Sequence, residues 1–424
     1  MTKNPSEARN LSVPPRTIMT PGPVEVDPRV LRALSMPILG QFDPAFTQIM
    51  NEVMEMLRAA FQTKNHWAYP IDGTSRAGTE ALIASLIEPG DKMLVPIFGR
   101  FGDLFVEIGE RYGAEIHTLS CPWGTVFDPE KVIAEIKKVH PKVVTLVHGE
   151  TSTGRMQPLA EIGRACRENG ALLIVDAVAT FCGVDIRTDE WCLDAVIGGA
   201  QKCLSIPSGI VPITYNDRVR QVIQKRKKVE RGIATAADRL EAEGHVPVRS
   251  NYFDLGQLQD YWSERRLNHH TEATSMEYAL HEGLKLVLDE GLQNRFARHL
   301  LNQKALIAGI RAMGLELFGD PDCIMPTVTC VSVPDGIRAD EVREVLLKHF
   351  GIEIAGSFGA LQGKIWRIGT MGYSCREDRV LSVLAGLEAA LIRCGAQVNR
   401  GEGVQAAIDV YTREASLKKT AESR

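Results

Sequence analysis

Residues 171–202, "ALLIVDAVATFCGVDIRTDEWCLDAVIGGAQK", hold two short apolar runs, each with a charged side chain near its end. The run "LLIV" is apolar without alternation, which is typical of a strand that is covered on both faces of a sheet. Asp176 ends this first run, and Lys202 follows the second run, 26 positions later. Neighbouring parallel strands bring the residues at their carboxyl ends to one edge of the sheet, where ligands bind. We therefore expect Asp176 and Lys202 to lie close together.

Short apolar runs alternate with helical patterns through the N-terminal half of the chain. Apolar residues at helical spacing predict a helix at 44–62, and strand-like runs at 92–98 and 142–150 are each followed by a helical pattern. This alternation predicts βαβ units and an α/β fold with a mainly parallel sheet. After about residue 270 the pattern changes to long helices over 272–313 and then to short strands, which predicts a second, α+β lobe.

These changes of pattern also predict the domain organisation. The opening "MTKNPSEARNLSVPPR" has no apolar core, so it is not a secretory signal, and we expect a flexible arm. The last stretch is polar with one amphipathic segment. The expected parts are an N-terminal arm at 1–20, a large domain at 21–285, a small C-terminal domain at 286–397 and a polar tail at 398–424.

Composition excludes several classes of partner and location. Lys and Arg number 49 against 53 Asp and Glu, and this net charge of −4 gives no reason to expect binding to nucleic acid or to an anionic membrane. No apolar run approaches the roughly 20 residues that a membrane span needs. The nine cysteines include no C-x-x-C pair, and their odd number favours reduced thiols. We therefore expect a cytoplasmic protein.

The stretch "YPIDGTSRAGTEALIASL" at 69–86 is a small polar turn that opens a helix. Thr74, Ser75 and Arg76 would present hydroxyls, backbone N–H groups and a cation at the helix N-terminus, an arrangement that suits a phosphate group. An ordinary helix cap by Thr74 or Ser75 is the alternative. The stretch matches neither the G-x-x-x-x-G-K-[ST] pattern nor the G-x-G-x-x-G pattern.

Three charged residues suggest that a reactive site lies next to this candidate phosphate site. A buried lysine at position 202 can lose its proton near neutral pH and attack a carbonyl. A buried Asp176 needs a partner, such as a protonated ring nitrogen. Arg367, after the strand-like "KIW", has the fork geometry that clamps a carboxylate. For each of these residues alone, a surface or structural role is the alternative. Together, however, the candidate phosphate site, Asp176 and Lys202 match what pyridoxal phosphate (PLP) requires of a binding site.

Longer motifs carry a family resemblance. "VHGETSTGRMQPL", "VDAVATFCG", "GGAQKCLSIPSG", "LNHHTEATSMEYALHEGL" and "WRIGTMG" are specific as a set. From residue 19 to about 395 the chain resembles the class V aminotransferases of fold type I, in the branch of alanine–, serine– and ureidoglycine–glyoxylate aminotransferases. The resemblance implies PLP as cofactor, a large domain with a mainly parallel seven-stranded sheet, a smaller α+β domain, and a homodimer with active sites at the subunit interface.

The resemblance also implies roles for individual residues. Lys202 matches the lysine that is covalently joined to PLP, and Asp176 matches the partner of its pyridine nitrogen. Arg367, with the backbone at Gly22, matches the site for the substrate carboxylate. Position 76 is more usually His, and position 101 is often Trp or Tyr. Further cofactor contacts are implied for Thr74, Ser75, Arg76, Phe101, Thr151, Val178 and Gln201, and for Thr271, which would reach the cofactor of the other subunit.

Two positions bear on the amino donor. Asn268 stands where alanine-type members commonly carry Tyr, and Gln41 lies in the loop that faces the substrate. Two carboxamides complement a ureido group, which offers donors and acceptors, whereas the methyl group of alanine offers neither. Members that use (S)-ureidoglycine carry this pair, so the resemblance implies transfer from ureidoglycine to glyoxylate, giving oxalurate and glycine in purine catabolism. Alanine or serine as donor, with glyoxylate or pyruvate as acceptor, is the alternative.

Other readings of the sequence stay open beside this one. A cysteine desulfurase would need a mobile thiolate near the cofactor, and no cysteine lies in an obvious exposed glycine-rich loop. The basic run at 224–232 would suit an acidic partner, but a solvated helix face explains it better. For the pair His269–His270 we expect a structural role and predict no metal site, because no cysteine or carboxylate spacing supports one.

Overall fold

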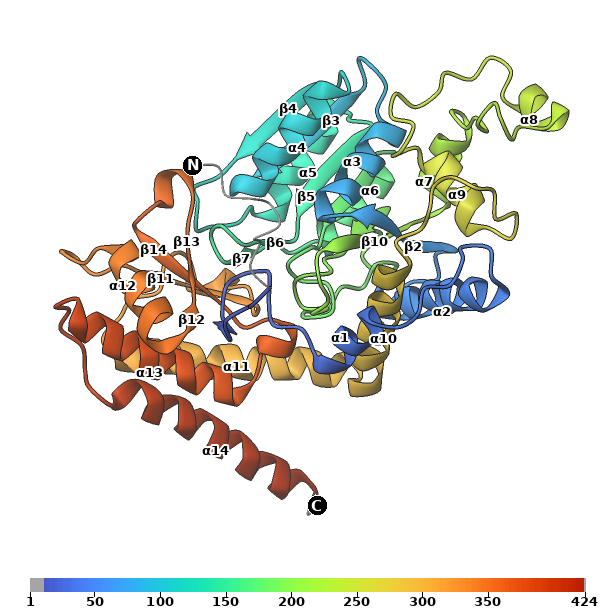
Figure 1. Cartoon of the computed structure of the whole chain (residues 1–424). Coiled ribbons are helices and arrows are strands. Elements are labelled where there is room, and N and C mark those ends of the chain that lie inside the picture. The colour runs from blue at the N-terminus through green and yellow to red at the C-terminus, as the bar shows by residue number, and fades with distance from the viewer. Residues whose placement is uncertain (1–10, 423–424) are drawn as a thin grey trace, which may run out of the picture.

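The structure is a computed structural model that describes residues 11–422, with side chains described up to residue 417. Figure 1 shows a larger α/β part, coloured blue to yellow, and a smaller part, coloured orange to red. The two parts have separate hydrophobic cores, one drawn from residues 30–287 and one from residues 305–407 with Met19. The boundary expected near residue 285 stays a prediction.

A seven-stranded sheet forms the centre of the large part (Figure 1). β10 runs antiparallel to both of its neighbours, and the other adjacent pairs are parallel. The predicted α/β fold with a mainly parallel seven-stranded sheet is therefore confirmed. In spatial order the strands are β2 (Trp67–Gly73), β10 (Gly209–Tyr215), β9 (Ala195–Ile197), β8 (Leu172–Asp176), β5 (Val143–Val147), β3 (Lys92–Ile97) and β4 (Glu115–Ser120).

Burial along the strands explains their sequence patterns. All residues of β5, "VVTLV", and of β8, "LLIVD", are buried, because helices cover both faces of the sheet there. β4, "EIHTLS", lies at the edge and keeps several side chains in contact with solvent. The register pairs Asp176 with Val147 on one side and with Ile197 on the other. Asp176 therefore lies in the middle of the sheet, at its carboxyl edge.

Helices cover the sheet in two groups. α3 (Ser75–Leu86) and α4 (Arg100–Arg111) contact each other and the sheet, as do α5 (Pro129–Val139) and α6 (Ala160–Glu168). The chain runs outward from β3 to β4 and then returns across β3 to β5, and right-handed crossovers place the two groups on opposite faces. This reversal opens a crevice beyond the carboxyl ends of the strands, where ligands bind in open α/β sheets.

Three further helices close the large part at the end near β2. α2 (Pro44–Ala60) begins at Asp43, whose side chain accepts from Ala45 N, and it packs against α10 (Thr274–Glu290). α1 (Pro28–Leu34) also contacts α10. Between α7 (Asp217–Gln224) and α9 (Leu255–Trp262) the chain carries the short α8 (Ala236–Glu241), which projects from the body at the upper right of Figure 1.

The small part packs helices against a three-stranded antiparallel sheet. Its strands follow the order β11 (Val328–Ser332), β14 (Ile365–Gly369) and β13 (Ala355–Gly356). α11 (Leu292–Ala312) contacts β11, α13 and α14, and α12 contacts α13 and β13. The remaining helices are α12 (Ala339–Val345), α13 (Glu377–Arg393) and α14 (Glu402–Glu422).

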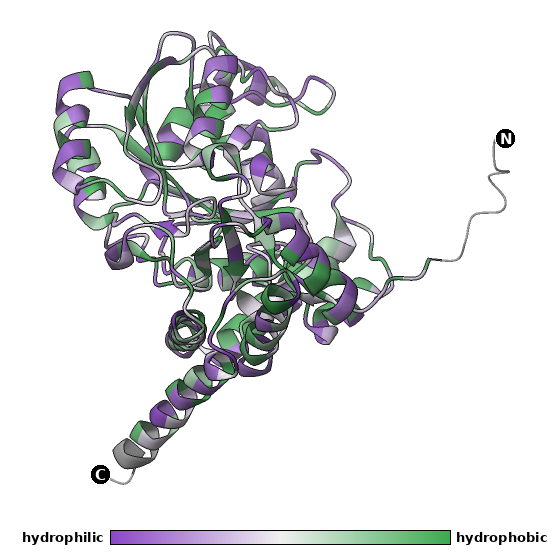
Figure 2. Ribbon diagram, turned by 90° about the vertical axis from the view of Figure 1, so that its left-hand side faces the viewer, coloured by the Kyte–Doolittle hydropathy of each residue, from purple (hydrophilic) through white to green (hydrophobic). Residues whose placement is uncertain are grey.

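The expected polar tail forms the helix α14. It packs along α11, and Ala407 is fully buried in the small core. Figure 2 shows that α14 extends away from the body toward the C-terminus and carries apolar as well as polar residues. One amphipathic stretch was visible in the sequence, but the partner surface on α11 was not. Within residues 11–422, no helix combines the length and apolarity that crossing a bilayer demands.

The N-terminal segment ties the small part to the crevice. β1 (Thr17–Ile18) pairs in parallel with β12 (Ile352–Glu353), and Gly369 N donates to Met19 O at 2.8 Å. Residues 1–10 of the expected flexible arm lie outside the described residues. The chain then turns toward the carboxyl edge of the large sheet, so Pro21 and Gly22 reach Lys202.

Candidate active site

A cavity of about 250 Å³ lies at the carboxyl edge of the large sheet. Loops that follow β2, β3, β5, β8 and β9 supply its walls, as the topology predicts for this edge. Nine of the residues that sequence analysis selected line it together: Thr74, Ser75, Arg76, Phe101, Thr151, Asp176, Val178, Gln201 and Lys202.

Lys202 is a buried amine rather than a solvated surface group. Burial and then the positive charge of Arg367 lower the pKa of Lys202, which ends at about 8 although Cys203, Asp176 and Glu150 act in the opposite direction. Lys202 Nζ donates a hydrogen bond to the backbone oxygen of Pro21. A much larger fraction of this amine is therefore unprotonated near neutral pH than in an ordinary lysine, as a nucleophile requires.

Asp176 is a buried acid whose Oδ1 accepts a hydrogen bond from Val178 N at 2.9 Å. Burial outweighs this hydrogen bond and the charge of Lys202, so the pKa of Asp176 is raised to about 6. A cation beside this carboxylate would offset the cost of burial and keep it ionised. The site thus suits a ligand with a positively charged nitrogen near Asp176.

The end of the cavity near α3 suits an anion. Thr74 occupies the N-cap position of α3 but makes no side-chain capping bond, so the helix starts with uncapped N–H groups. Ser75 Oγ donates to Gln201 Oε1 at 3.4 Å, and Arg76 lines the same cavity. The ordinary capping role that the sequence left open is absent here among the described residues. Hydroxyls, an arginine and a helix N-terminus together favour a phosphate group.

Phe101 is held at the cavity wall by a buried carboxylate. Phe101 N donates to Glu150 Oε2 at 2.9 Å, and the other oxygen of Glu150 accepts from Ser152 N at 2.9 Å and from Ser152 Oγ at 2.6 Å. Glu150 is fully buried, and burial raises its pKa although these hydrogen bonds lower it. Sequence analysis quoted Glu150 within "VHGE" and assigned it no role. Its position directly after an apolar strand was the available signal.

Arg367, on β14 of the small part, is absent from the cavity lining that the described residues form, but it contacts Thr151, which belongs to that lining. Its Nε donates to Gly356 O at 2.6 Å and its Nη1 donates to Thr151 O at 3.0 Å. The guanidinium also lies over the Phe358 ring at 4.7 Å, and Arg100 lies over the same ring at 4.2 Å. Sequence analysis missed Phe358 and Arg100, because a contact of two arginines with one aromatic ring leaves no regular spacing in the sequence.

Gln41, Asn268 and Thr271 are absent from the lining of this cavity as the described residues form it. Gln41 Nε2 donates to Asn268 Oδ1 at 2.8 Å, and Gln41 Oε1 accepts from Glu272 N at 3.2 Å. Gln41 and Thr271 line a separate, shallow pocket between α10 and the loop before α2. One chain therefore brings the two carboxamides together but away from Lys202.

The cysteine beside the lysine is not poised for reaction. Cys203 is fully buried, and burial raises the pKa of its thiol to about 12. Its Sγ donates to Ala179 O at 3.6 Å. A thiolate mechanism at this position would need a lowered pKa instead.

Comparisons with known proteins agree with this geometry. The family model described as aminotransferase class-V matches residues 38–376. The chain is 68% identical to (S)-ureidoglycine–glyoxylate transaminase of Bacillus subtilis, over 96% of this chain and 98% of that protein. The crystal structure of a ureidoglycine–glyoxylate aminotransferase from Bacillus subtilis matches with a TM-score of 0.90 and 64% identity, over 95% of this chain and 100% of that one.

A more distant solved structure carries a different donor in its name. An alanine–glyoxylate aminotransferase from Nostoc sp. matches with a TM-score of 0.85 and 37% identity, over 91% of this chain and 97% of that one. The family model covers most of the chain, and several relatives cover nearly all of it. The chain, with its buried lysine and acid at the edge of a parallel sheet, belongs to the class-V aminotransferases and is a transaminase.

Proposed function

We propose that this enzyme uses PLP to transfer the amino group of (S)-ureidoglycine to glyoxylate, which gives oxalurate and glycine, as a step of purine catabolism. The Bacillus subtilis relative named for this activity supports the proposal by its identity along the whole chain. The observation that carries the choice of donor is the hydrogen-bonded pair of carboxamides, Gln41 and Asn268. Nine cysteines without a disulfide among the described residues support a cytoplasmic location.

The residues of the cavity fit PLP at each of its groups. The uncapped start of α3, with Ser75 and Arg76, would hold the phosphate. Asp176 would face the pyridine nitrogen, and a positive charge there would offset the burial that raises the pKa of this carboxyl. Phe101 and Val178 offer an aromatic and an aliphatic surface for the two faces of the ring, and Lys202 Nζ would join the aldehyde carbon.

When bound, PLP supplies an aldehyde that accepts and returns the amino group, and a ring that withdraws electrons from the substrate Cα–H bond. Lys202 Nζ takes the proton from Cα and returns it during the exchange, because its lowered pKa leaves the amine free to act as a base. Asp176 would stabilise positive charge in the ring by ionic attraction. Glu150 keeps Phe101 in place through the backbone hydrogen bond at 2.9 Å.

Arg367 and the carboxamide pair, Gln41 and Asn268, would orient the substrate. The planar guanidinium of Arg367 suits the carboxylate that ureidoglycine and glyoxylate share. Its hydrogen bonds to Thr151 O and Gly356 O fix its position between the two parts of the chain. Gln41 and Asn268 offer two NH2 donor groups and two carbonyl acceptors between them, enough to pair with a ureido group after their mutual bond opens.

The separation between the carboxamide pair and the cavity supports a homodimer. We propose that Gln41, Asn268 and Thr271 of one subunit complete the active site of the other. Leu31, Met36, Ile38 and Phe42 are exposed large hydrophobic residues in the segment next to Gln41, and a subunit contact would cover them.

A competition between donors tests the proposal. Purified enzyme with PLP and glyoxylate would receive freshly generated ureidoglycine, alanine or serine, and glycine would be measured by mass spectrometry with isotopically labelled glyoxylate. We expect the highest kcat/KM with ureidoglycine. A higher value with alanine or serine would overturn the donor assignment, and no transfer from any of the three donors would overturn the proposed reaction.

A further inference from the structure

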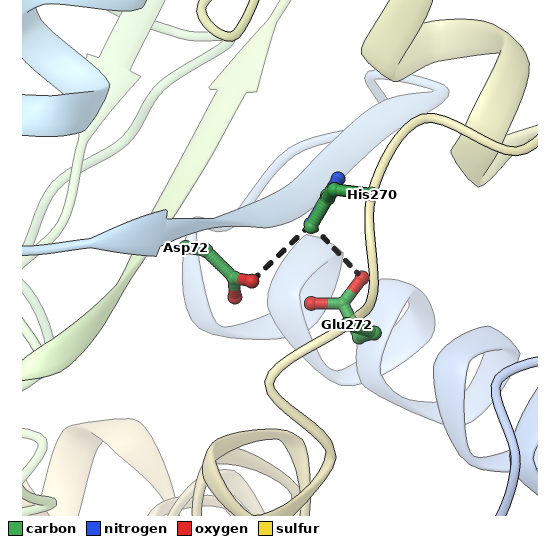
Figure 3. Close-up of side chains that lie close together, drawn as sticks. All are labelled: Asp72, His270 and Glu272. Carbon is green, nitrogen blue, oxygen red and sulfur yellow. Dashed lines mark ion pairs between the residues drawn. The ribbon is translucent and has the colours of Figure 1, made fainter.

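A cluster of ionisable side chains lies outside the cavity, at the end of β2. Asp72, His270 and Glu272 point toward one another there (Figure 3). His270 Nε2 lies 3.2 Å from Asp72 Oδ2 and 3.8 Å from Glu272 Oε2. One possible ligand atom from each residue lies within 4.8 Å of those of the other two. The sequence spacing gave no hint of this cluster, because Asp72 arrives from a strand nearly 200 residues away.

The hydrogen bonds of the two histidines determine which nitrogen faces the carboxylates. His269 Nε2 lies 3.3 Å from the backbone oxygen of Asn251, which can only accept, so this nitrogen carries hydrogen. Neutral His269 then has an acceptor at Nδ1, which lies 2.7 Å from His270 Nδ1. His270 Nδ1 must therefore be the donor. With a single hydrogen on its ring, His270 turns the lone pair of Nε2 toward Asp72 and Glu272, so a proton or a metal ion between these atoms would be needed to make the contact favourable.

A third carboxyl group lies buried beside this cluster. Glu277 of α10 is fully buried, and neither of its carboxyl oxygens has a hydrogen-bond partner among the described residues. Burial, and after it the neighbouring Glu272 and Asp72, raise the pKa of Glu277. Glu272 is also buried, and the hydroxyl of Tyr261 faces its carboxylate. Within the described part of the chain, no lysine or arginine forms an ion pair with Asp72, Glu272 or Glu277.

We propose that Asp72, His270 and Glu272 bind a divalent first-row metal ion, with Mn²⁺ and Zn²⁺ as the best matches. Two ligand atoms about 2.1 Å from such an ion lie about 3.0–3.4 Å apart, so the Asp72–His270 separation fits and the Glu272 side chain needs a small shift. One imidazole with two or three carboxylates suits these ions better than Cu⁺, which prefers sulfur ligands. Glu277 provides a further buried carboxyl group beside the ion, and His269 orients His270 through its hydrogen bond.

The ion would fix a segment of the proposed active site. His270 and Glu272 flank Thr271 and follow Asn268, whereas Asp72 directly precedes the turn that carries Thr74, Ser75 and Arg76. A metal bridge therefore joins the segment 268–272 to the end of β2. This structural role rests on the function proposed above, but binding of the metal does not.

Metal content of the intact enzyme tests the site. The PLP-loaded protein would be dialysed against a chelator, exchanged into chelator-free buffer, incubated with Mn²⁺ or Zn²⁺, freed of excess metal by gel filtration and analysed by inductively coupled plasma mass spectrometry. We expect one ion per chain. Glu272→Gln should weaken binding at least tenfold, and His269→Leu, which removes only the orienting partner, should weaken it about 10- to 100-fold. Loss of the six-line EPR signal of free Mn²⁺ would give the affinities.

A matched control separates this site from ordinary surface binding. His281 Nε2 forms a partly exposed pair with Glu52 Oε2 at 2.7 Å, so His281→Gln removes a histidine–carboxylate pair elsewhere and should leave the stoichiometry unchanged. If Glu272→Gln does not fold, His269→Leu still decides, because His269 is partly exposed to solvent and is not itself a ligand. Wild-type protein that retains no metal, or equal affinity for the metal in wild type and in both variants, would overturn the proposal. None of these measurements of metal content or affinity depends on transamination, so a negative result in the donor assay would not affect them.

Discussion

Replacement of Gly22 by alanine tests how the N-terminal segment supports the buried lysine. Gly22 has φ +108°, a conformation that residues with a side chain rarely adopt. A Cβ atom there would lie 2.5 Å from Lys202 Cδ and 2.6 Å from Lys202 Nζ. Van der Waals contact needs about 3.5–4.0 Å, so the lysine or the segment must move by about 1 Å.

Two separate costs follow from this geometry. Forcing alanine into the strained backbone conformation costs about 1–3 kcal/mol of folding stability. Displacement of a reacting group by about 1 Å costs about a hundredfold in rate, which corresponds to about 2.7 kcal/mol of transition-state stabilisation. We therefore expect kcat/KM to fall about a hundredfold in Gly22→Ala, with slower covalent attachment of PLP.

A second glycine separates strain from displacement. Gly90 has φ +89°, but a Cβ atom there would meet no other atom within 4 Å. Gly90→Ala should therefore lose stability without loss of kcat/KM. Transaminase kinetics, thermal unfolding and the yield of borohydride-fixed cofactor at Lys202 would be compared for both variants. Equal activity of Gly22→Ala and Gly90→Ala would refute the conclusion that the backbone at Gly22 positions Lys202.

Three further predictions concern the acid, the lysine and the donor. Asp176→Asn should retain PLP but lose about a hundredfold or more in kcat, because the ring nitrogen no longer meets a negative charge; unchanged kcat would contradict the role given to Asp176. The rate at which PLP joins the apoenzyme, followed by visible absorbance, should rise with pH and level off above about pH 8, because the pKa of Lys202 is lowered to about 8 and only the free amine reacts. Arg367→Gln removes one charge that lowers this pKa, so the midpoint should move upward, and a midpoint near the ordinary value of 10.5 in the unmodified enzyme would disprove the lowered pKa. Asn268→Tyr removes one carboxamide of the pair, so the ratio of kcat/KM for ureidoglycine to that for alanine should fall at least tenfold; an unaltered ratio would remove Asn268 from the account of specificity.

The features that depend on strand ends were accessible from the sequence. Asp176 and Lys202 each follow an apolar run, and parallel pairing of β8 and β9 brings them to one edge, as sequence analysis expected. The roles of these residues remain predictions, because geometry alone does not report chemistry. The seven-stranded sheet came from the family resemblance and is confirmed by the topology.

Features that depend on tertiary packing were not accessible. Glu150 becomes important only because the loop before α4 turns Phe101 N toward it, at a distance of 49 residues in sequence. The cluster of Asp72 with His270 joins a strand end to a loop before α10, and no spacing rule connects the two. The tail became the helix α14 because α11 offers an apolar surface, which a local pattern does not reveal.

The short pairing of β1 with β12 gives the N-terminal segment a mechanical consequence. Residues 17 and 18 are anchored to the small part. Three residues further on, the backbone oxygen of Pro21 accepts a hydrogen bond from Lys202 Nζ in the large part. This tether is too short to absorb much relative motion of the two parts, since three residues span at most about 11 Å when fully extended. A rotation of the small part toward bound substrate would therefore pull directly on the oxygen that accepts the hydrogen bond of Lys202.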